Sequence, residues 1–500
     1  MTKRIFSAML AVMMLLASVS CSESKTNSDE TEKTASGNET VGADEESKTP
    51  ETEAVLTEIE ARQLIPDDLP NEQFNGRDFR VLTINEYAYE IVSEDITGDA
   101  CNDAIYNRDV NIESRFDVKI SCTEEGSPEQ TLKTMATAGT DDYDLVGIKN
   151  YLSYVPINSK AVLNWTEIPY VDLTKPWHNE LANENATINN RLFTICSDLS
   201  VTSMTFTHAI FFNVELMENF GYTSSDLYSM VKEGSWTFDK FSSMVANMYE
   251  DKNGNNVKDK EDVFGFGYYI ENAADVWLSA FDQPIVSITD DNKIEVSFMC
   301  DKTISIIDKL TDFHTNNEGF FRYTTAAKEE ESMFLNEKLV MAPLRFFAAY
   351  NTLREMETTY SMLPYPKWDE AQDGYYTNAD DKFTAFAIPI TAYNNTDFIG
   401  IIYEVLCAES YKKVYPEYYD TALKGKYSSE PETAEMVDII MSGRDFDFSF
   451  QFGETYFVRL PYLVRDMLLN NKTNVASEYK VKEKAMKKTI EQKLLPLYTD

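Results

Sequence analysis

One stretch of the sequence carries side chains with the spacing of a metal-binding loop. The twelve residues 251–262, DKNGNNVKDKED, place oxygen-bearing groups at alternating positions of a tight turn. Calcium takes six to eight oxygen ligands, and a twelve-residue loop supplies them from positions 1, 3, 5, 7, 9 and 12. At these positions stand Asp251, Asn253, Asn255, Val257 (through its carbonyl), Asp259 and Asp262.

The loop departs from the EF-hand pattern at two positions. Asn256 replaces the glycine at position 6, which is tolerable because Asn enters the left-handed region easily. Asp262 replaces the final Glu and is one methylene shorter, which disfavours bidentate binding. Residues 263–268 read as a strand, so the loop is not half of an EF-hand pair. We expect a structural Ca²⁺ here, remote from any solute site, with a solvated acidic turn as the alternative.

The sequence offers little for catalysis. It contains no GxSxG, GxxxxGK[ST] or GxGxxG motif, and His178, His208 and His314 are too far apart for an HExxH zinc site. Among 84 Asp and Glu residues two carboxylates could flank a glycosidic bond, but nothing marks a pair out. We therefore expect no enzymatic activity and no cofactor for activity.

Composition indicates an acidic globular protein. Of the 500 residues 43% are hydrophobic and 13% aromatic, and the net charge is −39. This charge disfavours binding to nucleic acid and polybasic docking to lipid, both of which need clustered cations. Beyond Cys21 there are five cysteines with no CxxC pair, an odd number that does not fit a disulfide scaffold: Cys101, Cys122, Cys196, Cys300 and Cys407.

The N-terminus predicts export. Lys3 and Arg4 precede the apolar run 5–19, as in a secretory signal. The segment 16–21, LASVSC, resembles a bacterial lipobox, although Ser18 stands where that pattern prefers Leu. We expect a signal peptide over 1–20 and a lipid on Cys21, of the palmitate type. Because residues 22–57 contain no aromatic residue, we expect a disordered acidic tether over 21–73.

In the body, strand and helix patterns alternate. Residues 79–84, 117–122 and 144–149 read as buried strands, and 103–116 as a helix capped by Asn102 or Asp103. This alternation favours βαβ units and a mainly parallel sheet, which binds ligands at the carboxyl ends of its strands. Further strands are predicted at 191–197, 209–213, 339–344 and 383–390, and further helices at 214–220, 225–231, 238–249, 272–281, 347–356, 398–410 and 475–495.

Several segments together resemble a known family. They are AIFFNVELMENFGY (209–222), LYSMVKEGSWTFDKF (227–241), MFLNEKLVMAP (333–343), MLPYPKWDEAQDGYY (362–376) and YKKVYPEYY (411–419). In this order they resemble an extracellular solute-binding lipoprotein of a bacterial ABC importer, of the carbohydrate type and similar to family 1. The resemblance spans about residues 79–453.

The resemblance implies an α/β fold of the two-lobed, periplasmic-binding-protein-like type II, in which each lobe is a mixed, mainly parallel sheet flanked by helices. By that pattern lobe 1 holds residues 74–198 and 383–411, and lobe 2 holds residues 199–382 and 412–500. Hinge crossings are expected near 197–200 and 382–387. The family closes over its ligand by hinge bending, which is a ligand-driven shift of population.

A sugar site needs aromatic plates beside planar polar side chains. Candidates at strand ends are Tyr87, Asn150, Tyr151, Arg345 and Phe346. Asp198 is added from the first hinge crossing, and Trp277 from a helix start where the family presents a ligand-facing residue. For every aromatic candidate, ordinary packing is the alternative. Trp177 and Trp236 are assigned to packing, and Tyr375 and Tyr376 rank below the candidates.

The sequence therefore predicts a receptor, anchored by lipid to the outer face of the cytoplasmic membrane, that delivers a sugar or oligosaccharide to an ABC permease. We expect a monomer that contacts the membrane through its lipid only. A same-fold receptor for a peptide or polyamine and, less favoured, a surface carbohydrate hydrolase remain as alternatives.

Overall fold

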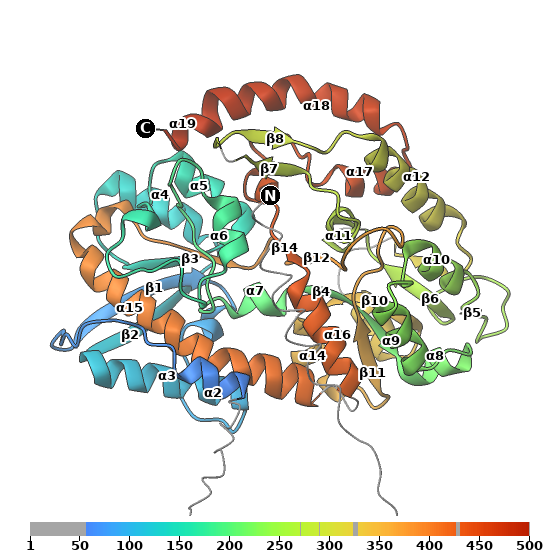
Figure 1. The fold of residues 1–500 in the computed structure, drawn as a ribbon, viewed down its shortest axis with the longest axis horizontal. Helices are drawn as coiled ribbons and strands as arrows, with labels where there is room; N and C mark the ends of the chain where they lie inside the picture. Colours follow the sequence, from blue (N-terminus) through green and yellow to red (C-terminus); the bar gives the residue numbers. More distant parts are fainter. Residues whose placement is uncertain (1–56, 271, 290, 324–328, 427–430, 500) are drawn as a thin grey trace, which may run out of the picture. The chain divides into compact units, whose positions relative to one another are not determined.

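The computed structural model describes residues 57–499 except 271, 290, 324–328 and 427–430 (Figure 1). The signal peptide, Cys21 and residues 22–56 lie outside this range. The last part of the expected tether is ordered, contrary to the prediction for 21–73. Helix α2 (Glu58–Gln63) begins with a capping box between Thr57 and Glu60, and Arg62 packs over the rings of Tyr411 and Tyr415. These contacts offset the conformational entropy lost when the segment becomes ordered, and the local composition gave no sign of them.

The first sheet has the order β13-β3-β1-β2. Strands β1 (Arg77–Ile84), β2 (Val118–Glu125) and β3 (Leu145–Lys149) run parallel, and β13 (Thr384–Ala387) joins β3 antiparallel. Successive residues of a strand point to opposite faces of the sheet. Helices cover both of these faces. Phe79 and Val81 pack with α3 (Ala100–Phe116) and α15 (Thr396–Glu409), whereas Leu82 packs with α4 (Pro128–Ala138).

The second sheet contains β11 (Tyr360–Leu363), β4 (His208–Asn213), β10 (Leu339–Arg345), β6 (Val263–Tyr268) and β5 (Tyr249–Glu250) in that order, and β9 (Phe320–Arg322) pairs with β6. Strands β10, β6 and β9 are parallel, and β4 is antiparallel to β10. One face packs on α10 (Phe238–Ala246), α11 (Asn272–Ala280) and α12 (Asp301–Asn316), the other on α13 (Glu329–Leu335) and α16 (Pro431–Ser442).

Three connections join the two sheets. The chain leaves the first sheet through α7 (Val201–Thr205) and enters β4, and it returns through residues 378–383 to β13. The third connection is one long helical segment, in which α15 continues into the π-helical stretches η7 (Ser410–Val414) and η8 (Glu417–Lys426) and is followed by α16. Most strands thus lie in these two sheets, and two further pairs form two-stranded sheets, β12 (Thr377–Asn378) with β14 (Arg444–Asp445) and β7 (Val286–Ile288) with β8 (Ile294–Val296).

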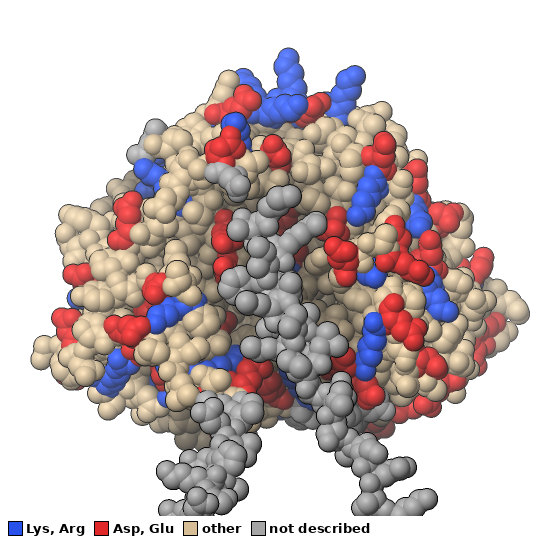
Figure 2. Space-filling view, viewed as in Figure 1, with Lys and Arg blue, Asp and Glu red and all other residues tan. Residues whose placement is uncertain are grey.

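The C-terminal segment packs against both halves of the body. Tyr456 donates a hydrogen bond to Asn158 at 2.7 Å, and the ring of Tyr498 lies 5.1 Å from that of Phe193. Helix α18 (Val475–Thr489) meanwhile stacks Tyr479 on Phe298. Figure 2 shows Lys and Arg side chains gathered along the edge that α18 occupies, whereas acidic side chains are spread over the rest of that face.

The remaining elements complete the chain. They are η2 (Ala88–Glu90), η3 (Asn150–Leu152), α5 (Tyr154–Asn158), η4 (Trp165–Glu167), α6 (Glu180–Ala186), α8 (Val214–Asn219), α9 (Ser224–Lys232), β7 (Val286–Ile288), β8 (Ile294–Val296), α14 (Phe347–Tyr350), η5 (Thr352–Glu355), β12 (Thr377–Asn378), η6 (Ile390–Asn395), β14 (Arg444–Asp445), η9 (Phe448–Phe452), α17 (Leu463–Leu469), η10 (Ile490–Leu494) and α19 (Leu495–Leu497). In the part of the chain covered by the structure, no helix combines the length and apolar character needed to span a bilayer.

Three local predictions were wrong. Residues 191–197 form isolated bridges to Ile188, Phe386 and His178, because these partners lie in three separate segments, one of them strand β13, and no single strand runs beside all of 191–197. The helix expected over 347–356 breaks into α14 and η5, since Asn351 has ψ −85°. The N-cap of α3 is Asp99, whose side chain accepts bonds from the backbone N–H groups of Cys101 and Asn102.

Candidate functional site

A cavity of about 1030 Å³ lies where the loop after β1 meets the segment after β10. The carboxyl end of a strand from each sheet therefore opens into it, as expected for a ligand site of an α/β fold. All three connections between the sheets contribute, for example through Phe206, Lys382 and Tyr418. The cavity is lined by Glu86, Tyr87, Tyr89, Thr97, Gly98, Asp99, Ala100, Cys101, Thr205, Phe206, Arg345, Phe347, Tyr350, Asn351, Arg354, Lys382, Glu417, Tyr418, Thr421 and Ala422.

Aromatic rings from both halves meet in this cavity. Phe206 lies between Tyr87 and Phe347, with ring centroids 5.8 and 5.6 Å away and both pairs edge-to-face. Tyr350, on the same helix as Phe347, donates a hydrogen bond from its hydroxyl to the carbonyl of Tyr418 at 2.6 Å. Such rings offer flat apolar surfaces with hydroxyl groups at their rims, which suits the C–H faces and hydroxyls of a sugar.

Arg345 supplies a positive charge beside the aromatic cluster. Its guanidinium lies 4.2 Å above the Phe206 ring, and its side chain is 24% exposed. Asp380 is the counter-ion, with 3.6 Å between the Arg345 Nη1 and the Asp380 Oδ2. Burial works to raise the pKa of Asp380, but the His208 ring, with its Nε2 3.7 Å from the Asp380 Oδ2, and the charges of Arg345 and Lys382 lower it overall. Arg345 is thus held over the ring by an ionised carboxylate and keeps donors for a polar solute.

The tyrosines of the first half act as neutral hydrogen-bonding groups. Burial and the nearby Glu90 raise the pKa of Tyr87, and the same two causes raise the pKa of Tyr89. The buried Tyr89 hydroxyl has no hydrogen-bond partner within the described residues. A buried unpaired hydroxyl is costly, so a solute that reached it would recover that cost.

The described lining of this cavity holds few groups that could react with a solute. No histidine is among its described lining residues, and the Cys101 thiol is buried. Of the three acids, Asp99 already caps α3 and pairs with Arg354 at 3.2 Å. Glu86 and Glu417 therefore remain as the only carboxylates not engaged in this way among the described lining residues.

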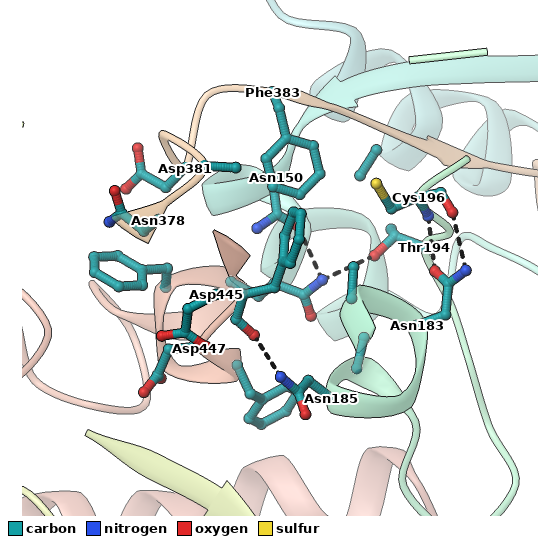
Figure 3. A pocket seen from close by; sticks show the side chains of 18 of the residues that line it. Asn150, Asn183, Asn185, Thr194, Cys196, Asn378, Asp381, Phe383, Asp445 and Asp447 are labelled. Atoms are coloured by element: carbon teal, nitrogen blue, oxygen red, sulfur yellow. Dashed lines mark hydrogen bonds between the residues drawn. The ribbon is translucent and has the colours of Figure 1, made fainter. Parts of the chain in front are cut away.

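A second, smaller pocket of about 30 Å³ lies beside Asn150 (Figure 3). Several of its amides are already paired: Gln451 donates to the Asn150 Oδ1 at 2.9 Å, and Asn183 exchanges two hydrogen bonds with the backbone of Cys196. The Asn378 Oδ1, by contrast, is buried without a hydrogen-bond partner among the described residues. Asn185 donates to the carbonyl of Phe446 at 3.0 Å. The volume is enough for about one or two waters, so a sugar does not fit in this conformation.

A third cavity of about 760 Å³ holds Asp198. Arg62, Tyr411, Tyr415 and Arg444 line it as well. Burial raises the pKa of Asp198 to about 7, although the charges of Arg62 and Arg444 act in the opposite direction. The structure therefore separates Asp198 and Asn150 from the large cavity that holds Tyr87 and Arg345.

Two predicted ligand residues belong to the core. Trp277 is 0% exposed, packs between Phe238 and Tyr365, and donates to the Tyr268 hydroxyl at 3.0 Å. Phe346 is also 0% exposed. The assignment of both to the solute is wrong for this structure, because α11 and β10 turn these large rings inward. No solute can reach either side chain without unpacking the core.

The other aromatic predictions had mixed outcomes. Tyr151, at the end of β3, is half-buried and lines none of the three cavities above. Trp177 and Trp236 are 0% exposed, which confirms their assignment to packing. Sequence reasoning missed Tyr89, Phe206, Phe347 and Tyr350. Tyr89 and Phe347 lie within two residues of predicted positions, so extending each candidate along its loop would have found them.

The calcium loop forms the hairpin between β5 and β6. Asn256 has φ 58°, the left-handed geometry that the missing glycine would have supplied. Asp251 accepts bonds from the N–H groups of Gly254 and Asn256, and the buried Asp262 accepts one from the Tyr249 hydroxyl. Over the described residues, no three His, Cys, Asp or Glu side chains stand close enough to hold a metal. Calcium at this loop remains a prediction.

Several solved structures have an architecture similar to that of this chain. A solute-binding protein of an ABC transporter from Thermotoga lettingae, bound with α-D-tagatose, matches with a TM-score of 0.52 at 12% identity, over 82% of this chain and 99% of that one. A cyclo/maltodextrin-binding protein with maltotetraose gives 0.55 at 11% identity, over 84% and 99%. The fold is that of an ABC-transporter solute-binding protein.

A third match is a family 1 extracellular solute-binding protein from Bifidobacterium longum subsp. infantis, with a TM-score of 0.51 at 11% identity, over 81% of this chain and 97% of that one. No protein-family model matches the chain, and no curated protein sequence matches it. The predicted two-lobed α/β fold class is confirmed. At this identity the likeness concerns the fold of a solute-binding protein, and the solute must be argued from the site.

Proposed function

We propose that this protein is the extracellular receptor of an ABC importer, which captures a sugar or oligosaccharide in the large cavity by hinge closure and releases it to a permease. The main support for this proposal is the large cavity, where aromatic rings and polar side chains from both halves line one space between the two sheets. Tyr87 would face the solute from the first half, Phe206 from the outward connection, and Arg345 and Phe347 from the second half.

The proposal excludes turnover. Glycoside hydrolysis needs a carboxylic acid and a second carboxylate flanking the bond, and the described lining of the cavity offers no pair set apart for this purpose. We infer that the solute leaves unchanged. Release of a new saccharide from a glycan mixture incubated with the protein would contradict this inference.

A thermal-shift panel tests the function. It contains maltose, maltotetraose, tagatose and xylotetraose, with a tripeptide and spermidine as the competing solute classes. A ligand at about 100 times its Kd adds roughly 2.7 kcal/mol of stability. For a body of this size, that corresponds to a rise in melting temperature of about 3 °C. A shift with a sugar alone supports the proposal, and a shift with only the peptide or the amine replaces it.

We also propose that Cys21 carries the lipid that anchors the protein outside the cell. Support comes from the LASVSC segment and from the extracellular role of proteins with this fold. Replacing Cys21→Ser should move the protein from the membrane fraction to the medium. Unchanged membrane retention, with no label from radioactive palmitate in the wild type, would exclude this anchor.

A further inference from the structure

A buried carboxylate joins the two segments through which the chain passes between the sheets. Glu90 ends η2, directly after β1, and is 0% exposed. Its Oε2 accepts from the backbone N–H of Thr202 at 2.9 Å and from the Thr202 hydroxyl at 3.0 Å. Its Oε1 accepts from the Thr384 hydroxyl at 2.6 Å. Thr202 lies in α7, on the outward connection, and Thr384 begins β13, where the chain has returned.

A buried arginine ties the same turn to the third connection. Arg108, also 0% exposed, donates to the backbone carbonyls of Glu90 and Ile91. It donates as well to the Ser410 hydroxyl at 3.0 Å, and Ser410 begins the π-helical stretch η7. The short turn 90–91 is therefore bonded, through two side chains, to the outward connection, to the strand residue that directly follows the return connection, and to the third connection.

The same turn carries the wall of the large cavity. Tyr87 and Tyr89 precede Glu90 and line that cavity, and the Tyr87 ring contacts Phe206 at the end of α7. Packed interiors shift between discrete arrangements rather than deform smoothly. Tyr87 lies only three residues before Glu90, so a movement of its ring is passed along this short stretch of backbone to the side chains that bond the connections.

We propose that Glu90 and Arg108 are positioning residues that couple solute contact at Tyr87 and Tyr89 to hinge movement between the two sheets. This inference rests on the proposed function, since it concerns the closure that follows capture. Neither side chain can touch the solute, because both are fully buried. A buried charged group that serves stability alone can often be replaced by well-packed apolar residues. Hydrogen bonds from one side chain to separate connections, by contrast, fix the positions of those connections relative to each other.

A second buried glutamate provides a matched comparison. Glu404 is also 0% exposed and accepts hydrogen bonds at 2.9 Å from the Trp177 indole and the His178 ring. Both donors come from one loop that packs with the first sheet, and neither belongs to a connection between the sheets. Glu404 itself lies in α15, in the part of the third connection that packs in the core of the first sheet. A substitution at Glu404 therefore measures the cost of disturbing a buried carboxylate that bonds neither Thr202 nor Thr384.

The test uses the full-length protein and the panel sugar with the largest thermal shift. Titration calorimetry gives the Kd, and small-angle scattering gives the decrease in radius of gyration at saturating sugar. We expect Glu90→Ala to weaken binding at least tenfold and to abolish the decrease. Thr384→Val, which removes one hydroxyl at nearly constant volume, should weaken binding about threefold and reduce the decrease. Glu404→Gln should lower the melting temperature yet bind and compact like the wild type.

The outcomes separate the two proposals. If the wild type neither binds a panel sugar nor compacts, the proposed function fails and this inference falls with it. If the wild type compacts, and Glu90→Ala and Thr384→Val compact and bind equally well, the coupling alone is overturned. Should Glu90→Ala not fold, Thr384→Val decides, because wild-type binding and compaction in that variant would contradict the proposal.

Discussion

The large cavity and the pocket of Figure 3 are both built from strand ends, yet only one can receive a solute. At the small pocket, Asn150, Asn183 and Gln451 have bonded to one another or to backbone groups. At the large cavity, Tyr87 and Arg345 both contact the Phe206 ring. Their hydrogen-bond donors remain directed toward a cavity of about 1030 Å³. Polar groups at a strand end form a site only when the fold leaves their bonding capacity unspent.

Truncating the wall of the large cavity should have the largest effect on binding. Tyr87→Ala removes one ring face and one hydroxyl, and we expect the sugar Kd to rise roughly 30- to 100-fold. Calorimetry with the panel sugar measures it. Tyr393→Ala serves as control, since Tyr393 is 63% exposed on η6 and lines none of the three cavities above. A Kd that changes equally little in both variants would remove the solute from this cavity.

Disturbing the small pocket should affect stability and leave binding alone. Gln451→Leu deprives the Asn150 Oδ1 of its donor, which costs about 1–3 kcal/mol of unfolding free energy when the acceptor stays buried. We expect a lower denaturation midpoint and a sugar Kd within twofold of wild type. If the Kd instead shifts tenfold while stability holds, Asn150 contacts the solute as the sequence predicted, and the contrast between the pockets is broken.

The pH dependence of stability sharpens the account of the buried turn. Burial raises the pKa of Glu90 to about 7 from a value of 4.5. Between these values the folded protein keeps a proton that the unfolded chain has lost, so this group makes the unfolding free energy fall as pH rises from 4.5 to about 7. Arg108, the adjacent cation, bonds the Glu90 carbonyl rather than its carboxylate.

Glu90→Gln isolates this contribution, because it removes the titrating group and leaves all other carboxylates. We expect the unfolding free energy of the variant to fall less steeply with pH over that interval, as measured by urea denaturation at several pH values. Parallel curves for variant and wild type would show that Glu90 is ionised throughout.

Calcium removal should give the smallest effect, since the loop lies on a hairpin of the second sheet. If Ca²⁺ binds, a chelator lowers the melting temperature of the wild type by one or two degrees, and Asp251→Ala shows the lower value with and without chelator. Identical melting of both proteins under all conditions would leave the solvated turn as the correct interpretation.

The sequence predicted the elements better than the contacts. Strands β1, β3, β4 and β10 fall close to where short, nearly continuous apolar runs placed them. Local patterns carry such information because they reflect burial on one face or both. Tyr87 and Arg345 followed from the strand-end rule and meet at one cavity.

What failed depended on tertiary contacts. The Trp277 prediction was wrong because it came from the family resemblance, which does not say which way this ring points on α11. Asn150 bonds a partner 301 residues away. Residues 191–197 lack a strand because their bridging partners come from three separate segments. The sequence did not single out Glu90, because no local pattern distinguishes this one buried acid from the other Asp and Glu residues among the 84.

A crystal structure with the panel sugar bound tests the central claim most directly. The account predicts the sugar in the large cavity, with a ring face against Tyr87 or Phe206 and a hydroxyl bonded to Arg345. Density for the sugar in the cavity of Asp198, or on the outer surface with the large cavity filled only by water, would contradict it.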